Sequence, residues 1–213
     1  MDIVPGNVRL LNRAQRRVLL RSICAYRTVS ELAVNTIAAT PPADLLAKER
    51  EKTFVIRQAA ITAATTGVEP KNVTLDKWQE RWSSGETGGW TRRLIPDVRS
   101  WCNRRHGRTN FHLTQFLSGH GCFGQYLHRI RKVADPMCVD CQAPVDDAEH
   151  AFFMCDRWWR QRSDLERNIR RKFTPESAVR SMLESSTNWS AVDSYVNLVL
   201  AAREEEERER QRR

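Results

Sequence analysis

Three cysteines and one histidine lie close together in the second half of the chain. They are Cys138, Cys141, His150 and Cys155, with the spacing C-x2-C-x8-H-x4-C. Zinc takes four sulfur and nitrogen ligands in a tetrahedron, and a site with four protein ligands is structural because no position is left for a substrate. Two cysteines separated by two residues can turn back on one ion, and a helical turn with a loosened end could aim His150 and Cys155 inward. The spacing therefore predicts a structural zinc site; the alternative is a disulfide or a chance cluster of buried cysteines.

The residues around this cluster add two expectations. Trp158 and Trp159 follow the last ligand closely, and we expect both to shield the metal from water. Cys24, Cys102 and Cys122 have no close thiol partner in the sequence, and they are predicted to be small core residues.

The charge of the chain is uneven. Residues 1–137 hold 22 basic and 11 acidic residues, whereas residues 138–213 hold 13 and 15. Within 88–132, nine basic residues accompany Asp97 alone. Such an excess predicts a polyanion as partner, because phosphate neutralisation dominates non-specific nucleic-acid binding; the alternative is a solvated basic face. The candidate contacts to RNA or DNA are Arg92, Arg93, Arg99, Arg104, Arg105, Arg108, Arg129 and Arg131.

Aromatic residues are interleaved with these arginines. Arginine combined with aromatic residues is typical of grooves that follow phosphates and stack bases. For Trp101, Phe111 and Phe116, however, we expect burial in the core, with only the arginines facing outward.

Helical periodicity dominates the chain from Val8 onward. Asn7, Thr74 and Thr174 are predicted helix N-caps, and Thr28 or Ser30 is predicted to begin the second helix. The charged end from Glu204 is predicted to be a solvated helical extension or a frayed tail. The predicted fold class is mainly α: a helical bundle with a small zinc-knuckle insertion between helices. There is no apolar run of eighteen residues for a membrane span and no signal-peptide pattern, so we expect no membrane partner, no secretion and reduced thiols.

Composition suggests four segments. The stretch from Ser83 to Gly89 is rich in serine and glycine and is predicted to be a flexible boundary. The predicted segments are a helical segment at 1–86, a basic helical region at 87–137, the zinc knuckle with its following helix at 138–172, and C-terminal helices with a charged tail at 173–213.

Several sequence blocks together resemble a known family. The blocks are Gln15-Arg16, Ala25 to Ser30, Pro41 to Arg50, Thr91 to Pro96, Asn110 to Gly121, Tyr126-Leu127 and the Cys-Cys-His-Cys set. They resemble the C-terminal part of the pol polyprotein, a reverse transcriptase with endonuclease, of non-LTR (LINE-like) retrotransposons. The resemblance is greatest to the insect type-1 elements that insert into ribosomal RNA genes and to their telomere-targeted relatives.

This resemblance implies a role for each part of the chain. Residues 1–86 would follow the reverse-transcriptase core as a thumb-like or connection-like segment, and Cys138, Cys141, His150 and Cys155 would match the zinc ligands of the family. The region would hold RNA or target DNA during target-primed reverse transcription, beside the remainder of the polyprotein. It would act in the nucleus after synthesis in the cytoplasm.

The resemblance implies an enzyme only for the parent polyprotein. Polymerases hold two divalent ions with carboxylates, and the only Asp-Asp pair, Asp146-Asp147, lies in the loop between Cys141 and His150. We therefore assign no catalytic residue to this chain, expect it to be inactive alone, and expect magnesium only in the polymerase part outside it.

Two classes of function remain open. The first is a nucleic-acid-binding segment of a reverse-transcriptase polyprotein. The second is a zinc-stapled helical structural or protein-interaction module that does not bind nucleic acid. A weaker third class, a free-standing zinc hydrolase, requires an open coordination position that four protein ligands do not leave.

Overall fold

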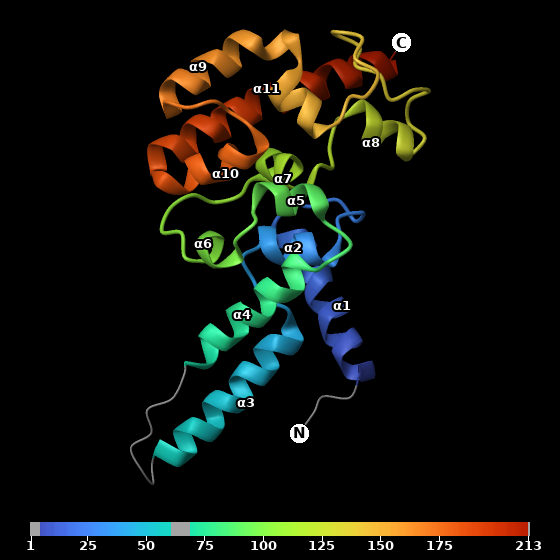
Figure 1. The fold of residues 1–213 in the computed structure, drawn as a ribbon. Helices are drawn as coiled ribbons and strands as arrows, with labels where there is room; N and C mark the ends of the chain where they lie inside the picture. The colour runs from blue at the N-terminus through green and yellow to red at the C-terminus, as the bar shows by residue number, and fades with distance from the viewer. Residues whose placement is uncertain (1–4, 61–68, 213) are drawn as a thin grey trace.

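The structure, a computed structural model, describes residues 5–60 and 69–212. Within these ranges the chain forms helices and no β-strand (Figure 1). The first half holds α1 (Pro5–Ser22), α2 (Glu31–Ile37), α3 (Ala43–Ala60), α4 (Pro70–Ser83), α5 (Gly89–Leu94) and α6 (Val98–Cys102). The second half holds α7 (Phe111–Ser118), α8 (Gly124–Arg129), the short helices η1 (His150–Met154) and η2 (Asp156–Trp158), α9 (Trp159–Ile169), α10 (Pro175–Glu184) and α11 (Ser186–Arg212). The predicted mainly α fold class is confirmed.

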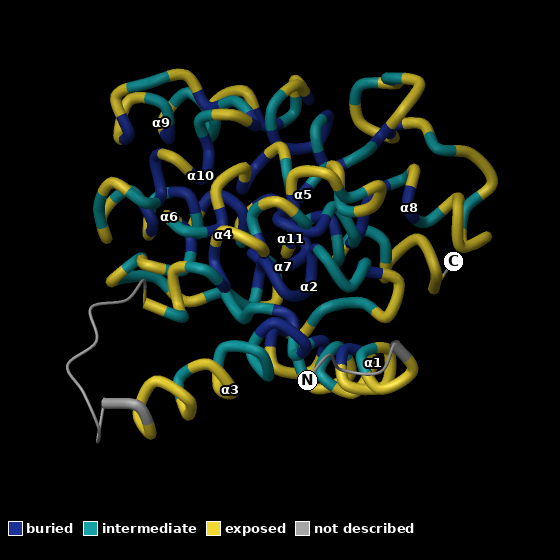
Figure 2. The backbone as a smooth tube through the Cα atoms, turned by 60° about the horizontal axis from the view of Figure 1, so that its bottom comes forward, coloured by how far each residue is buried: buried dark blue, intermediate teal, exposed yellow. Residues whose placement is uncertain are grey.

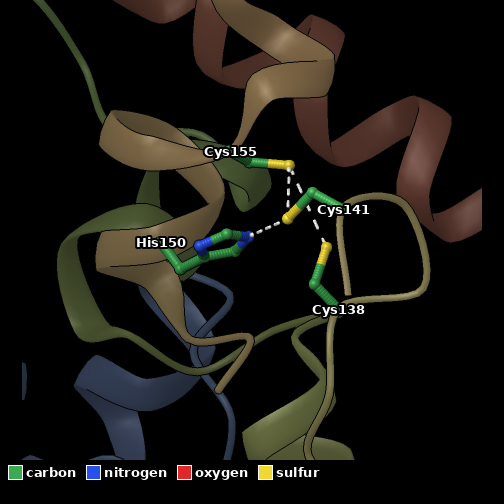
Figure 3. Close-up of side chains that lie close together, drawn as sticks. All are labelled: Cys138, Cys141, His150 and Cys155. Carbon is green, nitrogen blue, oxygen red and sulfur yellow. Dashed lines mark hydrogen bonds between the residues drawn. The ribbon is translucent and has the colours of Figure 1, made fainter. Parts of the chain in front are cut away.

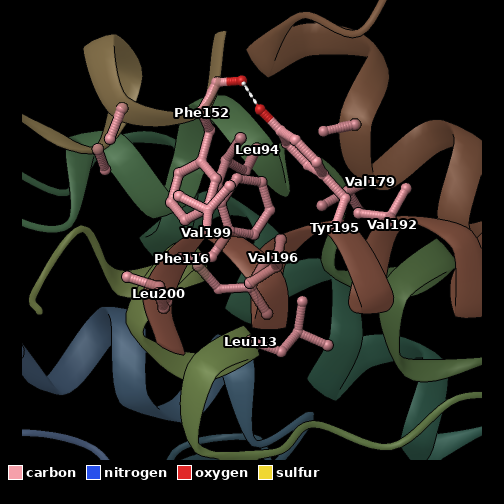
Figure 4. Packing of buried hydrophobic residues seen from close by; sticks show 14 of the residues in the cluster. Leu94, Leu113, Phe116, Phe152, Val179, Val192, Tyr195, Val196, Val199 and Leu200 are labelled. Carbon is pink, nitrogen blue, oxygen red and sulfur yellow. Dashed lines mark hydrogen bonds between the residues drawn. The ribbon is translucent and has the colours of Figure 1, made fainter. Parts of the chain in front are cut away.

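The main core is built on α11. Its buried residues recur at helical spacing (Val192, Tyr195, Val196, Val199 and Leu200), and such a stripe faces the core of a globular protein. Figure 4 shows this stripe packing against Leu113 and Phe116 of α7 and Phe152 of η1. The Tyr195 hydroxyl donates a hydrogen bond of 2.8 Å to the carbonyl oxygen of Phe152. The long helix therefore joins the predicted zinc region to the middle of the chain.

Helices α1, α3 and α4 extend away from this core (Figure 1). Asp44 at the start of α3 pairs with Arg81 of α4 at 2.8 Å and accepts a hydrogen bond of 3.0 Å from Asn12 of α1. Burial alone would raise the pKa of Asp44, but the hydrogen bonds from Arg81 and Asn12 outweigh it and hold that pKa below its ordinary value. One buried carboxylate thus ties three helices together. A second, smaller core lies beneath them and is formed by Leu45, Leu75, Trp78, Trp82 and Val98.

The predicted boundary near residue 86 is crossed by close contacts. The Trp82 indole nitrogen donates a hydrogen bond of 2.8 Å to the carbonyl oxygen of Ile95, and the main core contains residues from all four predicted segments. The division into segments stays a prediction.

Some of the predicted helix N-caps are confirmed and others are wrong. Of the two candidates for the start of α2, Ser30 caps the helix, because its side chain accepts a hydrogen bond from Ala33 N. Thr174 caps α10, as predicted, and forms a capping box with Ser177. Asn7 and Thr74 do not cap helices, because α1 begins at Pro5 and α4 at Pro70. The charged end continues α11 to Arg212, so it is a helical extension.

Exposure corrects further expectations. Trp101 and Phe116 are fully buried, as expected, but Phe111 is 42% exposed at the first turn of α7. Cys122 is buried, Cys102 is half-buried and Cys24 is exposed, so the expectation of a core position was wrong for Cys24. No helix in the part of the chain that the structure describes is long and apolar enough to cross a membrane.

Candidate metal centre

The four predicted ligands converge. The ligand atoms of Cys138, Cys141, His150 and Cys155 all lie within 4.8 Å of one another, and Figure 3 shows the three sulfurs and the ring pointing into the same space. The Sγ atom of Cys155 is 3.9 Å from that of Cys138 and 4.0 Å from that of Cys141. A tetrahedron with zinc–sulfur bonds of about 2.3 Å places its sulfur atoms about 3.8 Å apart. The cluster therefore has the donors and the dimensions of a Cys3His zinc site.

A tight turn brings the first two cysteines together. The backbone N–H of Gln142 donates to the carbonyl oxygen of Cys138 at 3.0 Å, and Cys138 N–H donates to Ala143 O at 2.9 Å. Gln142 has a φ of 60°, in the left-handed region that non-glycine residues rarely adopt. The chain thus reverses just after Cys141 and returns both thiols to one side.

A widened helical turn aligns the other two ligands. His150–Met154 form a π-helix, and Cys155 N–H donates to the carbonyl oxygen of His150 at 2.8 Å across five residues. The Asp147 carboxylate caps this turn by accepting from His150 N–H at 2.8 Å. An α-helix would place a residue five positions on at about 140° around the axis. The π turn brings Cys155 back to the face of His150, as the expectation of a loosened turn requires.

Two of the three thiols are buried, Cys141 is half-buried, and none of the three forms a disulfide. Cys138 and Cys155 are fully buried, and all the cysteines are free. Their sulfur separations are far above the roughly 2.05 Å of a disulfide, which argues against that alternative. Burial, as the main cause, raises the pKa of Cys155 to about 12. Without a cation this thiol stays neutral, whereas a bound metal deprotonates it outright.

A buried ion pair holds in place the segment from Cys138 to His150, here called the ligand loop. The Asp146 carboxylate pairs with the Arg203 guanidinium of α11 and accepts a hydrogen bond of 2.7 Å from Gly124 N–H at the start of α8. The carboxylates of Asp146 and Asp147 are thus both engaged in holding the loop. Arg157 adds a second link from the loop residue Asp140 to Glu206 of α11.

The two tryptophans after the last ligand differ. Trp158 is 4% exposed, whereas Trp159 is 53% exposed at the start of α9. Only Trp158 can therefore help to exclude water, and the expectation for Trp159 was wrong.

Half of the predicted nucleic-acid contacts are held by internal partners. Arg93 bridges Glu149 and Glu176 at 2.6 Å each, and Arg99 pairs with Asp76 at 2.7 Å. Arg92 donates to the carbonyl oxygen of Trp82. Arg104 lies over the Trp101 ring at 4.1 Å, and burial lowers its pKa. These four arginines stabilise the fold, which leaves less of their charge for a ligand.

The other four predicted contacts face solvent. Arg105, Arg108, Arg129 and Arg131 are exposed, and within the described ranges none of them forms an ion pair. Arg129 lies over the Tyr126 ring at 5.1 Å. Their role as nucleic-acid contacts stays a prediction.

The sequence contained a second basic stretch that the predicted site left out. Residues 5–30 hold six arginines and no acidic residue. Five of these arginines lie on α1, and one follows it. The sequence could have identified this stretch because it contains no aspartate or glutamate that could pair with the arginines. The number of basic residues alone does not distinguish it.

Comparison with known proteins gives distant relatives. The chain is 30% identical over 161 residues to the Retrovirus-related Pol polyprotein from type-1 retrotransposable element R1 of Bradysia coprophila, which covers 68% of this chain and 16% of that protein. It is 29% identical over 167 residues to the Putative 115 kDa protein in type-1 retrotransposable element R1DM of Drosophila melanogaster, with coverages of 69% and 16%. A Pol polyprotein from element R1 4 of Nasonia vitripennis is 24% identical over 201 residues, with coverages of 88% and 51%.

The chain therefore spans from about a sixth to about half of the length of these relatives. No family model matches it, and no solved structure matches it significantly. The resemblance stated from the sequence blocks is confirmed, because the matches cover most of the chain. The chain is a distant homologue of part of the Pol polyproteins of insect type-1 R1 retrotransposable elements.

Proposed function

We propose that this chain is a zinc-stabilised segment of an R1-type Pol polyprotein that holds RNA or DNA during target-primed reverse transcription. The observation that carries the proposal is the Cys3His cluster, whose four ligand atoms lie within 4.8 Å of one another. Four protein ligands close the coordination sphere, so the metal acts on folding and not on a substrate.

The cluster also supports a basic surface. Asp146, inside the ligand loop, accepts from Gly124 N–H at the first turn of α8, and its carbonyl oxygen accepts from Gln125 N–H at 2.9 Å. Arg129 and Arg131, at the end of α8 and just after it, are exposed. Bound zinc that holds the loop would therefore also hold the start of α8. It would thereby fix the positions from which Arg129 and Arg131 contact a phosphate chain.

The rest of the polyprotein supplies the chemistry in this proposal. Polymerase and endonuclease activity, with their magnesium ions, belong to parts of the parent outside this chain. The segment would work beside them in the nucleus, after synthesis in the cytoplasm.

The test is binding of a fluorescent oligonucleotide, measured by anisotropy over a series of salt concentrations. We expect the affinity to fall steeply with added salt, because bound arginines release counterions from the phosphates. The variant Arg129→Gln/Arg131→Gln should bind more weakly and with a shallower salt slope. The matched control Arg160→Gln/Arg180→Gln removes the same charge from exposed residues of α9 and α10. No binding at low salt would contradict the proposal.

A zinc-stapled interaction module remains the second candidate. The observation in its favour is that Arg92, Arg93, Arg99 and Arg104 are held by internal partners. Bound zinc together with an absence of oligonucleotide binding would favour this function.

A further inference from the structure

Helix α1 and the turn after it carry an unusual run of charge. Residues 5–30 contain six arginines and no aspartate or glutamate: Arg9, Arg13, Arg16, Arg17, Arg21 and Arg27. Four of them are spaced by four residues, from Arg9 to Arg21, so they lie along one side of the helix about 6 Å apart. Like charges at this spacing destabilise a helix. An outside anion would relieve that repulsion.

The chain folds back after α1 and places Arg27 beside the row of arginines from Arg9 to Arg21, here called the arginine ladder. Cys24, with a φ of 54°, reverses the chain after α1. The Arg16 guanidinium then donates to the carbonyl oxygens of Arg27 and Val29 at 2.6 and 2.7 Å. The result is a groove of about 690 Å³ between α1 and the returning segment, lined by Arg16, Arg17, Arg21 and Arg27 with apolar and thiol groups between them.

These arginines lack acidic partners. Arg9, Arg13, Arg17, Arg21 and Arg27 are exposed, and within residues 5–60 and 69–212 none of their side chains forms an ion pair. By contrast, arginines of the body of the molecule pair repeatedly, as Arg81 does with Asp44, Arg93 with Glu149 and Arg157 with Asp140. Helix α1 thus carries a run of arginines that no acidic side chain of the described residues neutralises, and it extends from the body with its outer side exposed (Figures 1 and 2).

We propose that the exposed arginine surface of α1, formed by Arg13, Arg17, Arg21 and Arg27 and including the groove, binds the phosphate backbone of a polynucleotide. The inference rests on the proposed function and adds a second surface that performs it beside Arg129 and Arg131. From Arg9 to Arg21 the ladder measures about 18 Å, the rise of roughly five nucleotides along a duplex strand. An anion with evenly repeated charges complements such a ladder better than one acidic side chain does.

The experiment uses the full chain and oligonucleotides of one length as single-stranded RNA, single-stranded DNA and DNA duplex. In Arg13→Gln/Arg17→Gln/Arg21→Gln, we expect affinity for the oligonucleotide that the wild-type chain prefers to fall roughly 100-fold near 0.1 M salt and the salt slope to fall by about 2. The corresponding lysine variant should keep the wild-type slope, because the contact is to charge and not to a base. The preferred oligonucleotide among the three identifies the source of the phosphates.

The matched control is Arg160→Gln/Arg167→Gln/Arg180→Gln, which removes the same net charge from exposed positions on α9 and α10. If this control weakens binding as much as the α1 variant does, net charge alone acts and the α1 assignment is wrong. Unchanged binding by the α1 variant overturns the assignment but leaves the proposed function standing. Absence of binding by the wild-type chain overturns both.

Leu10 and Val18 on α1 are 66% and 63% exposed, so the experiment also tests binding to membranes. Basic amphipathic helices also bind anionic membranes, so vesicles of phosphatidylcholine with phosphatidylserine are tested in parallel. Binding to vesicles but not to oligonucleotides overturns the inference.

Discussion

At the scale of single residues, the arrangement around Asp146 explains why the ligand loop keeps its place. Asp146 and Arg203 have side chains only 4% and 9% exposed. Removing one partner from a buried pair leaves an uncompensated charge, which costs roughly 3–5 kcal/mol. We expect Arg203→Leu to lower the free energy of unfolding by about that amount in urea titrations, and Arg203→Leu/Asp146→Leu to recover most of it. The exposed Arg208, paired with Glu205 at 2.6 Å, is the control, and its loss should cost less than about 1 kcal/mol.

The ligands themselves give the second prediction at this scale. Cys138→Ser should abolish stoichiometric zinc and unfold residues 135–172, because structural zinc contributes on the order of 10 kcal/mol to folding. Elemental analysis and a circular-dichroism melt measure the two effects. Cys24→Ser, which changes an exposed thiol outside the cluster, should leave both unchanged. A normal melt for Cys138→Ser would refute the structural role of the site.

At the scale of elements, the π turn at His150–Met154 sets the register between the last two ligands. Inserting an alanine after Met154, which is 63% exposed, would place Cys155 six positions after His150, one more than the π turn accommodates. At 100° per residue, an α-helix places a residue six positions on about 120° away from the face of His150. We expect the insertion to lose zinc, as judged by a competition assay with a chromophoric chelator.

The control for this insertion keeps the register. Met154→Ala removes the exposed side chain but not the residue, so zinc affinity should match the wild type. If the insertion and the substitution bind zinc equally well, the π turn does not position Cys155.

At the scale of the whole molecule, one core joins the four predicted segments. It contains Val34 from the first, Phe116 from the second, Phe152 from the third and Val196 from the fourth. Cooperative unfolding of such a core gives one transition for all probes. We expect tryptophan fluorescence and helical circular dichroism to change at the same temperature, and a chelator to lower both together. Two separate transitions would instead support the predicted division of the chain.

The sequence alone determined the helical class, the candidate ligand set and the relationship to Pol polyproteins. Each of these depends on local order in the chain. Helical periodicity and the capping residues Ser30 and Thr174 act over a few residues. Likewise, a metal knuckle requires its ligands at short, fixed separations, so Cys138 to Cys155 could be identified without knowing the fold.

Only the tertiary structure decided which charges are free. Arg93 is neutralised by Glu149 and Glu176, which lie 56 and 83 residues away in the chain, and no local pattern foretells such partners. Trp158 and Trp159 are neighbours in sequence, yet the turn into α9 buries one and exposes the other. Among the residues that the structure describes, no acidic side chain pairs with the arginines of α1, whose helix extends from the body. Burial and ion pairing depend on which distant segments meet, and that is set by the packing of the whole chain.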